Sequence, residues 1–585
     1  MSANDELAHI FERMAQMLEL TGADSFRVSA HARAARAIAE QTKDLRGLAS
    51  DQKALTAIDG IGAKTAKKIA EYAETGSISE HDALAAKVPA GLLQLLRIPG
   101  VGPKTVRAMW EDKGVEGPED LRTIIDDGSI MDLPRMGAKT VENIRKALKF
   151  ADHGEQRSRL GDAMPIAEVI VEKMAAVEGV TQAAFAGSLR RGKETIGDLD
   201  ILVTSTAPQV VREAFLSMPI IVEVLAQGET KCSVRVRADG REIQTDLRIV
   251  PEESWGAALM YFTGSKEHNV KLRERSLKRG LTLNEYGLYP VDDEDGPPQR
   301  RGVVPVASQR EEDIYDALGL PWIAPELRED RGEVSDDRTP PALITLEDIK
   351  SELHSHTTAS DGRMSIEELA TRAKERGFHT IAVTDHSKSS VIANGLDEDR
   401  LRAHIAAVRA SKVTGITILA GSEVDILPDG SLDYDDELLA ELDVVVASPH
   451  ASLRQETKAA TKRMIKAIEH PLVHVIGHPT GRIIGRRDGL PLDIEEIVSA
   501  AAEHDVALEI NANTVRLDLQ DLHVAAAMEA GAKIAIDCDV HREEDFEHLR
   551  YGVLTGRRGG LTADACVNTW GARKLRTWLR SKGRD

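Results

Sequence analysis

The chain has few cysteines, few aromatic residues and no long apolar run. Three cysteines in 585 residues cannot frame the fold by disulfides, and they indicate a reducing compartment. No run approaches the roughly 18 apolar residues of a membrane-spanning helix. The start, Met1-Ser-Ala-Asn-Asp-Glu, lacks the basic-then-apolar order of a signal peptide. We therefore expect a soluble, cytoplasmic protein with no membrane partner.

An overall positive charge is lacking too. The 96 acidic side chains outnumber the 75 Lys and Arg, for a formal net charge of −21. This balance argues against a generally basic nucleic-acid coat, although local basic surface can still bind DNA. The length predicts several domains with more than one core. The stretch 321–343 is polar, charged and broken by prolines, which predicts a linker between two of them.

Nine side chains of the metal-ligand type stand at the ends of successive apolar runs after residue 346. The runs, such as Thr380–Thr384 and Lys533–Ile536, are short and rich in β-branched residues, and amphipathic helical stretches separate them. This pattern predicts βαβ units around a parallel barrel or sheet, with the strand ends meeting on one face. A lone histidine is more often structural, but nine such residues favour a metal centre. They are His354, His356, Asp361, His386, Glu423, His450, His478, Asp539 and His541.

One pattern occurs three times in the first 150 residues, at 58–66, 98–106 and 133–141. It consists of an apolar residue, a turn with Gly-x-Gly, and Lys-Thr opening a helix; in the third copy Arg135 replaces the first glycine. Glycines permit the tight turn, and the helix start offers free N–H groups to a phosphate oxygen. Plain helical turns capped by glycine are the alternative. The candidate DNA-binding residues are Gly60, Gly62, Lys64, Gly100, Gly102, Lys104, Gly137 and Lys139.

Three carboxylates fall on two expected strands in the middle of the chain. Asp198 and Asp200 stand two residues apart at the start of an apolar strand, so both side chains should point to one face. Asp246 lies on a second expected strand, 242–250. Such carboxylates repel one another unless a cation lies between them, and hard oxygen ligands favour Mg²⁺. The arrangement predicts a two-metal phosphoryl-transfer centre.

Two further segments carry a resemblance. Gly187-Ser188, a spacer and then Gly197-Asp-Leu-Asp are typical of the nucleotidyltransferase superfamily. The segment Tyr261-Phe-Thr-Gly-Ser265, with Asn269 after it, is similar to the nucleotide-binding segment of DNA polymerase beta and other family X polymerases. With the repeated hairpin pattern before them and the ligand-rich region after them, the whole chain resembles the bacterial family X DNA polymerases. In these a polymerase core is fused to a polymerase-and-histidinol-phosphatase (PHP) domain.

The resemblance implies a multidomain α and α/β fold. It has a helical helix-hairpin-helix N-terminal region, a polymerase beta-like nucleotidyltransferase palm with a thumb, and a C-terminal distorted (β/α)7 PHP barrel. The implied domains are an N-terminal lyase-like domain at 1–80, a second hairpin region at 81–150, palm and thumb at 151–320, a linker at 321–345, and the PHP domain at 346–585.

For the polymerase site, the resemblance implies that Asp198, Asp200 and Asp246 are the catalytic carboxylates and hold two Mg²⁺ or Mn²⁺ ions. The implied nucleotide-binding residues are Gly187, Ser188, Arg191, Gly197, Arg157, Tyr261, Phe262, Gly264 and Asn269. Lys68 occupies the place of the lysine that forms a Schiff base in relatives with 5′-deoxyribose-phosphate lyase activity. Its alternative role is an ordinary phosphate contact.

For the PHP domain, the resemblance implies up to three Zn²⁺ or Mn²⁺ ions. One would be held by His354, His356, Glu423 and Asp539, a second by Glu423, His450 and His478, and a third by Asp361, His386 and His541. Arg482 is a further candidate, as a phosphate clamp. The implied chemistry is metal-assisted phosphoester hydrolysis at a DNA 3′ end, extending to abasic-site or 3′-phosphate processing.

Together these features predict a monomeric bacterial DNA repair enzyme, associated with the nucleoid when on DNA. It would fill short gaps, in base excision repair or end joining, and trim 3′ ends. Its partners would be gapped or nicked DNA with a 3′-OH primer end and deoxynucleoside triphosphates. Two alternatives stay open: a PHP domain that acts on small molecules as a phosphoesterase or pyrophosphatase, and a non-catalytic DNA-end binding scaffold.

Overall fold

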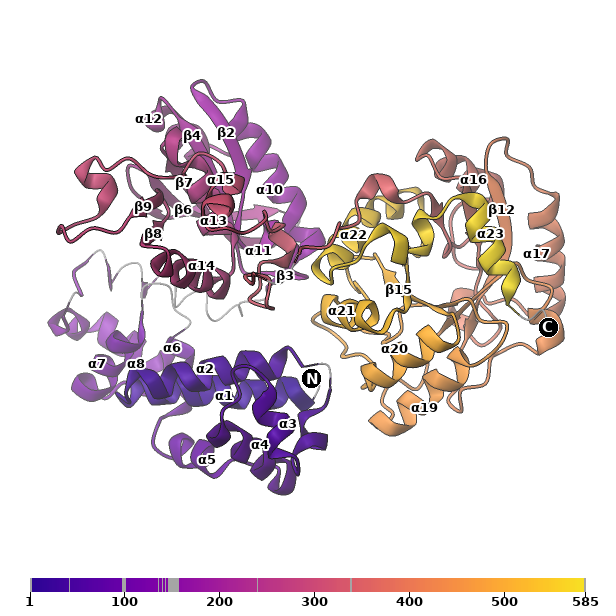
Figure 1. Cartoon of the computed structure of the whole chain (residues 1–585), viewed down its shortest axis with the longest axis horizontal. Coiled ribbons are helices and arrows are strands. Elements are labelled where there is room, and N and C mark those ends of the chain that lie inside the picture. The colour runs from indigo at the N-terminus through magenta and orange to yellow at the C-terminus, as the bar shows by residue number, and fades with distance from the viewer. Residues whose placement is uncertain are drawn as a thin grey trace. The chain divides into compact units, whose positions relative to one another are not determined.

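The computed structural model describes residues 3–41, 43–96, 101–134, 136–138, 140–141, 144–145, 157–238, 240–336 and 339–582. The chain forms two compact units, Met1–Gln156 and Arg157–Asp585 (Figure 1). The boundary expected near residue 150 falls outside the described residues. No helix within the described ranges is long and apolar enough to cross a membrane.

The first unit is helical, as the resemblance implied, and has two apolar cores. Phe11, Ile38 and Ile69 are fully buried in one, and Leu20, Leu92 and Met109 in the other. Local signals fix the helix ends: the Asp24 carboxylate accepts a hydrogen bond from Arg27 N at 3.0 Å, and Gly76 ends a helix at φ +72°. The helices are α1 Ala3–Leu20, α2 Ser25–Ala39, α3 Gln52–Ala57, α4 Ala63–Thr75, α5 Ser79–Ala85, α6 Ala90–Leu95, α7 Pro103–Lys113 and α8 Pro118–Asp126.

The second unit begins with a five-stranded mixed sheet, and we call residues 157–336 the mixed-sheet domain. The strand order is β2-β4-β7-β6-β5; β4 and β7 are parallel and the other neighbours antiparallel. The elements up to the last strand of this sheet, with β1 and β3 forming a separate two-stranded sheet, are β1 Ser158–Arg159, α10 Leu160–Ala175, β2 Val180–Phe185, α11 Gly187–Arg190, β3 Thr195–Ile196, β4 Asp198–Ser205, α12 Pro208–Leu216, β5 Ile221–Gln227, β6 Lys231–Ala238 and β7 Arg241–Val250. After the sheet come α13 Trp255–Thr263, α14 Lys266–Lys278, β8 Leu281–Asn284, β9 Gly287–Pro290 and α15 Glu311–Ala317.

The stretch expected to be a linker differs from that expectation, because much of it is packed into the mixed-sheet domain. Ile323 is fully buried, and so is Arg328, whose Nη1 donates to Glu311 Oε1 at 2.7 Å. Arg328 and Glu329, two of the charged residues that suggested solvent exposure, are partners in buried ion pairs. Composition alone does not distinguish an exposed linker from a segment with buried ion pairs, because both contain the same residue types.

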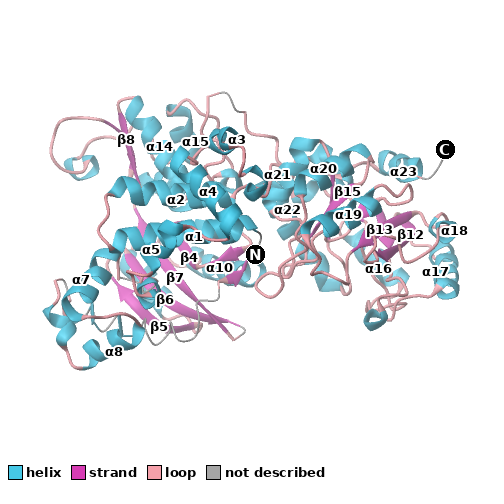
Figure 2. Ribbon diagram, turned by 90° about the horizontal axis from the view of Figure 1, so that it is seen from below, coloured by secondary structure: helices cyan, strands magenta, loops and turns pink. Residues whose placement is uncertain are grey.

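The rest of the second unit, residues 339–582, is a barrel of seven parallel strands in sequence order, here called the barrel domain. Ser355 and Val540 form a parallel bridge beyond the first and last strands, so the barrel is nearly closed and the expected fold class is confirmed. Helices α16, α17, α19, α20 and α21 surround the strands (Figure 2). The strands are β10 Ser351–Glu352, β11 Thr380–Val383, β12 Thr417–Asp425, β13 Val444–Ser448, β14 Val475–Ile476, β15 Ala507–Asn511 and β16 Lys533–Asp537. The helices are α16 Ile366–Glu375, α17 Glu398–Ala410, α18 Asp436–Leu439, α19 Thr457–Ile468, α20 Ile494–Glu503, α21 Asp521–Ala530, α22 Leu549–Arg558 and α23 Ala572–Ser581.

Candidate active sites and nucleic-acid interface

The three carboxylates of the mixed-sheet domain lie on neighbouring parallel strands. Asp198 and Asp200 belong to β4, and the register pairs Asp200 with Asp246 on β7. Burial raises the pKa of Asp200 to about 7, and repulsion from Asp198 and Asp246 adds to the effect. Lys231 Nζ lies 2.7 Å from Asp246 Oδ2 and supplies one positive charge. Carboxylates that repel one another in this way fit a divalent cation, which would favour their ionised forms.

A tight turn brings the expected phosphate-binding residues against these carboxylates. Gly187 opens α11 with φ +62°, and a Cβ built there would lie 2.6 Å from Asp200 Oδ2. Glycine is therefore required twice at this position, by the backbone conformation and by the close approach. Ser188 follows on the same short helix. The turn and the carboxylates form one site.

The arginines of the site are engaged with protein groups. Arg191 Nε lies 3.0 Å from Glu329 Oε1, and its Nη1 donates to the Thr263 carbonyl at 2.7 Å. Arg157 Nη2 donates to the Thr195 carbonyl at 2.7 Å, beside Gly197. A triphosphate would have to share these guanidinium groups with their present partners.

The segment expected to hold the sugar and base lies at the junction of α13 and α14. Asn269 Nδ2 donates to the Tyr261 carbonyl at 2.6 Å, and a Cβ at Gly264 would approach Asn269 Oδ1 to 2.8 Å. The rings of Tyr261 and Phe262 meet edge to face at 5.2 Å, and Arg248 stacks on Phe262 at 4.2 Å. These contacts hold the segment in one conformation.

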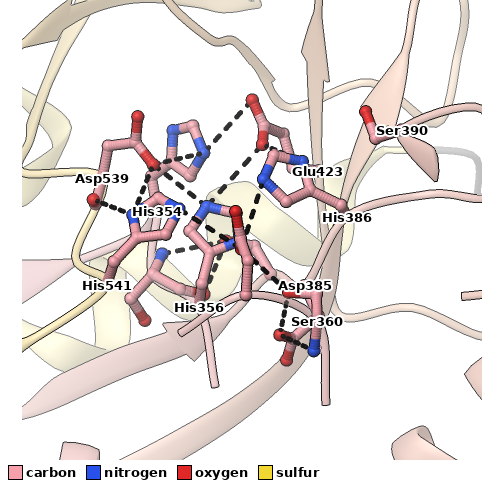
Figure 3. Close-up of polar contacts among 12 residues, drawn as sticks. His354, His356, Ser360, Asp385, His386, Ser390, Glu423, Asp539 and His541 are labelled. Carbon is pink, nitrogen blue, oxygen red and sulfur yellow. Dashed lines mark hydrogen bonds and ion pairs between the residues drawn. The ribbon is translucent and has the colours of Figure 1, made fainter. Parts of the chain in front are cut away.

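The nine ligand-type residues of the barrel domain gather at the carboxyl ends of its strands, as the sequence predicted. Glu423, on β12, contacts several of them, and Figure 3 shows it beside His386. Its Oε2 is 2.8 Å from His386 Nδ1, and its Oε1 is 2.9 Å from His478 Nε2 and 3.2 Å from His450 Nε2. Asp539 Oδ1 lies 3.0 Å from His356 Nε2. Burial opposes the charge of Glu423, but the surrounding imidazoles prevail and its pKa lies well below the usual range.

The geometry groups these ligands into overlapping sets. The ligand atoms within each set lie within 4.8 Å of one another, and the sets are His356-Asp361-His386-His541, His354-His356-Glu423 and His386-Glu423-His450. His356 therefore belongs to the set of Asp361 as well as to that of Glu423. His386 likewise belongs to the set of Glu423 as well as to that of Asp361, because adjacent strand ends bring these side chains together. This grouping differs in part from the assignment that the resemblance implied.

The donor set fits metal ions. Several buried nitrogen and oxygen atoms of the cluster make no hydrogen bond of good geometry to the described residues, although some lie within ion-pair distance of one another. This arrangement is costly without a cation. These atoms are His354 Nε2, His356 Nδ1 and Nε2, His386 Nδ1, Glu423 Oε2, His478 Nδ1 and Asp539 Oδ1. The side chains of Asp361, His450 and His541 remain 35%, 23% and 32% exposed, so they form the rim of the site.

Sequence reasoning missed the residues that orient the ligands. Glu509 on β15 lies 2.6 Å from His354 Nδ1, and Asp425 Oδ1 lies 2.9 Å from His450 Nδ1. Carboxylates in this position fix the imidazole ring and its tautomer. Asp425, two residues after Glu423 on β12, could have been found by its period-two spacing. Glu509 could have been found from the apolar run Val506–Ile510, which was not recognised as a strand.

Arg482 is not placed as a free phosphate clamp. Its Nη2 donates to Glu194 Oε2 of the mixed-sheet domain at 2.7 Å, and its Nη1 donates to Gln520 Oε1 at 3.0 Å. The guanidinium group thus bridges the two domains of the second unit.

A buried charge cluster joins the same domains next to the phosphate-binding turn. Arg558 of α22 donates to Glu329 Oε1 at 2.9 Å, to the Arg191 carbonyl at 2.7 Å and to Asp521 Oδ2 at 2.8 Å. Its side chain is 2% exposed. Burial opposes the charge of Glu329, but Arg558 and Arg191 hold its pKa at about 2. The mixed-sheet and barrel domains therefore meet through matched charges.

In the first unit, Lys68 is part of a compact polar cluster. Its Nζ lies 2.8 Å from Glu80 Oε2 and 3.1 Å from His31 Nε2, and Arg27 Nη2 lies 3.0 Å from Glu80 Oε1. Burial lowers the pKa of His31, so its neutral form is favoured beside the lysine. Glu80 was not foreseen, because it comes from a separate helix, α5.

Two of the three expected hairpins can be compared with their predicted geometry. Gly62 and Gly102 are the N-cap residues of α4 and α7, and both would leave a Cβ in open space. Gly60 has φ +88°, which favours glycine. Lys64, Lys104 and Gly137 are exposed. Gly100 and Lys139 lie outside the described residues.

Comparison with known families agrees with these features. Family models match for a helix-hairpin-helix domain at 2–78, a SAM-like helix-hairpin-helix tandem at 92–149, a DNA polymerase beta palm at 162–234, a DNA polymerase beta thumb at 258–329 and a PHP domain at 352–513. The fold and sites thus define a family X polymerase core joined to a PHP barrel.

Comparison with individual proteins identifies the branch of this family to which the chain belongs. The chain is 36% identical over 577 residues to DNA polymerase/3′-5′ exonuclease PolX of Bacillus subtilis (strain 168), covering 98% of this chain and 99% of that protein. DNA polymerase lambda of Rattus norvegicus is 27% identical over 342 residues, 55% of this chain and 56% of the relative. DNA polymerase lambda of Arabidopsis thaliana is 26% identical over 292 residues, 46% and 53% respectively. The chain belongs to the bacterial PolX family of DNA polymerases.

Proposed function

We propose that this protein is a DNA-directed DNA polymerase that fills short gaps during DNA repair, and that its barrel domain is a metal-dependent 3′→5′ exonuclease. The observation that carries the proposal is the presence of two separate cation-fitting sites in one chain, the carboxylates of β4 and β7 and the cluster around Glu423. The Bacillus subtilis relative combines both activities in its name. The substrates would be gapped or nicked DNA with a 3′-OH end and deoxynucleoside triphosphates, met by a monomer in the cytoplasm.

In the polymerase site, Asp198, Asp200 and Asp246 would hold two Mg²⁺ or Mn²⁺ ions, which would activate the primer 3′-OH and neutralise the leaving pyrophosphate. Ser188 and the N–H groups of its turn would bind the triphosphate, together with Arg191 and Arg157. The backbone from Tyr261 to Gly264 would lie against the sugar, and Asn269 would reach the base. Because the turn touches Asp200, the phosphates and the ions would be bound as one unit.

In the barrel domain, the nine ligands would hold up to three Zn²⁺ or Mn²⁺ ions, which would supply Lewis-acid activation for phosphoester hydrolysis. Glu509 and Asp425 would keep His354 and His450 in the orientation that presents the ring nitrogen to the ion. The exposed rim of Asp361, His450 and His541 would admit the DNA end. Abasic-site and 3′-phosphate processing would use the same opening.

In the first unit, the helix starts at Gly62 and Gly102 would grip DNA phosphates, with Lys64 and Lys104 adding charge. Lys68 would serve as the nucleophile of a 5′-deoxyribose-phosphate lyase. Glu80 and His31 support this role, because they hold the amine at one position and leave it only 14% exposed.

The proposal is tested with a one-nucleotide-gapped DNA whose primer carries a 5′ label, in Mg²⁺ or Mn²⁺, with and without deoxynucleotides. The parent protein, Asp246→Asn and His354→Ala are compared. We expect Asp246→Asn to lose extension alone and His354→Ala to lose shortening alone. If the parent protein extends the primer but does not shorten it, the barrel domain would instead be assigned to the hydrolysis of small molecules. Absence of both activities would favour a DNA-end binding scaffold.

A further inference from the structure

Two adjacent apolar side chains stand in solvent beside the barrel site. Val391 is 79% exposed and Ile392 is 106% exposed. They belong to the short 3-10 helix Val391–Ala393, in the loop that follows the ligand His386. Single exposed apolar residues are common on proteins, but two side by side next to a metal-ligand cluster indicate a surface that contacts a ligand. We call this pair the 391–392 tip.

The loop is tied on one side to the ligand His450. Ser390 Oγ donates to Asp425 Oδ2 at 2.8 Å, and the other oxygen of this carboxylate lies 2.9 Å from His450 Nδ1. Ser389 N also donates to Asp433 Oδ2 at 2.7 Å. Figure 3 includes Ser390, the residue directly before the tip, in the view of the ligand cluster. The tip therefore lies a short chain of hydrogen bonds from a rim ligand.

The other side of the loop is tied to the segment of Asp361, a second rim ligand. Asn394 Nδ2 and Arg400 Nη2 both donate to the Ala359 carbonyl, at 3.2 and 2.9 Å. Arg400 Nη1 also donates to the Gly395 carbonyl at 3.0 Å. The loop is thus anchored at both ends, which keeps the apolar pair at the rim and prevents it from folding inward.

We propose that the 391–392 tip is a wedge that stacks against the terminal base pair of a DNA 3′ end and separates its last nucleotide before hydrolysis. This inference rests on the 3′→5′ exonuclease proposed above. The hydrogen bonds through Asp425 and the Ala359 carbonyl connect the loop of the tip to His450 and to the segment of Asp361, the rim where a DNA end would enter. Aliphatic side chains unstack base steps when they insert between them, and base contacts of this kind are insensitive to sequence. An exonuclease that trims any 3′ end needs such a contact.

The test uses the full-length protein with both tip residues changed, Val391→Ser and Ile392→Ser. Cleavage by the parent and the variant is measured on one labelled strand in three forms: single-stranded, paired at its 3′ end, and mismatched at its 3′ end. Losing one stacking contact should slow cleavage of the paired end about tenfold. The single-stranded and mismatched ends should be cleaved within about twofold of the parent rate, because they need little or no separation.

The matched control is Val304→Ser, since Val304 is 81% exposed in the mixed-sheet domain, and its ratio of paired to single-stranded rates should equal that of the parent. Equal loss on all three ends, or no loss on any, would overturn the wedge. A fall in melting temperature of the tip variant would also overturn it, because it would mean that the tip packs on another part of this chain.

A second measurement separates the wedge from the exonuclease itself. In a His354→Ala background, 2-aminopurine at the paired 3′ terminus should brighten on binding when the tip is intact, and brighten less in the tip variant. If the parent protein cleaves no DNA, the proposed exonuclease fails, whereas this fluorescence still tests the wedge. Equal fluorescence with and without the tip would contradict it.

Discussion

At the scale of single residues, Gly187 is where the proposed phosphate-binding turn meets the carboxylates proposed to be catalytic. In Gly187→Ala a Cβ would lie 2.6 Å from Asp200 Oδ2 on a backbone at φ +62°. We expect Asp200 to be displaced and primer extension to fall by about 100-fold, since small misplacements at reacting centres have effects of this size. Extension and 3′ trimming are measured in parallel, and trimming should not change.

The matched control for this change is Gly240→Ala. Gly240 has φ +76° and would leave its Cβ in open space, so the backbone strain is similar without the contact. If both variants lose extension equally, strain rather than the approach to Asp200 is responsible.

Glu311 predicts a pH dependence of stability. Burial alone would raise its pKa, but Arg328 and Arg190 outweigh burial and lower the pKa to about 2. A depressed carboxyl pKa stabilises the fold above the unfolded value of 4.5, and the contribution is lost as pH falls from there towards 2. The difference corresponds to about 3 kcal/mol of unfolding free energy. Urea midpoints of the parent and Glu311→Gln should therefore converge below pH 4.5, and pH profiles that stay parallel would contradict this origin.

Lys68 predicts a covalent adduct. With a gapped DNA that carries a 5′-deoxyribose phosphate, borohydride should trap the parent protein and not Lys68→Ala, because the amine forms the Schiff base. Lys67→Ala is the control, since Lys67 is the neighbouring exposed lysine of α4. Equal trapping of both variants would leave Lys68 as a phosphate contact.

The gathering of the nine ligand-type residues could be predicted from sequence because they follow recognisable strands. The same signal reveals neither Glu80 beside Lys68 nor Glu329 beside Arg191, because these partners come from distant elements and have no fixed spacing. The sequence also could not predict that His356 and His386 each belong to two ligand sets, since this depends on how neighbouring strand ends converge.

At the scale of elements, the starts of α4 and α7 determine how the first unit would hold DNA. Lys64 is exposed in the first turn of α4, beside N–H groups that are free of helical partners. Replacing it by alanine should lower the slope of log affinity against log salt by about 1, because one phosphate contact is lost. The slope is measured on gapped DNA from binding titrations at several salt concentrations.

Lys53→Ala serves as the comparison, since Lys53 is an exposed lysine of a different helix, α3, whose first N–H groups are already capped by the Asp51 carboxylate. An equal fall in slope for both variants would mean that general surface charge, and not the hairpin, binds the backbone.

Elements with a clear period were predictable, and those with mixed signals were not. The strands β4 and β7 follow their apolar runs closely. The sixth barrel strand, β15, was overlooked because Glu509 interrupts its apolar run, although that glutamate is buried against His354. The linker prediction is wrong for part of the stretch for the opposite reason, because the charged residues Arg328 and Glu329 are buried in ion pairs.

At the scale of the whole molecule, charged pairs connect the two domains of the second unit, and they differ in burial. Arg558 is 2% exposed and contacts both Glu329 and Asp521. Arg558→Ala should destabilise the second unit by about 3–5 kcal/mol, because two carboxylates would lose a buried partner. Urea unfolding of the full-length protein measures the change.

A more exposed pair across the same boundary provides the comparison. Arg550 and Glu168 are 37% and 42% exposed, so Arg550→Ala should cost less than about 1 kcal/mol. Equal effects of the two substitutions would show that burial does not set the strength of these contacts.

Among the described residues, four ion pairs of this boundary join a glutamate to an arginine, and in each the acid is on the polymerase side. Glu168, Glu194, Glu326 and Glu329 meet Arg550, Arg482, Arg557 and Arg558. A shortened enzyme that ended near residue 336 would keep these glutamates and lose every one of those arginines. It would expose these glutamates next to the turn proposed to attract a triphosphate. Anyone who wishes to use the polymerase without its nuclease should inactivate the barrel by point substitution and leave it attached.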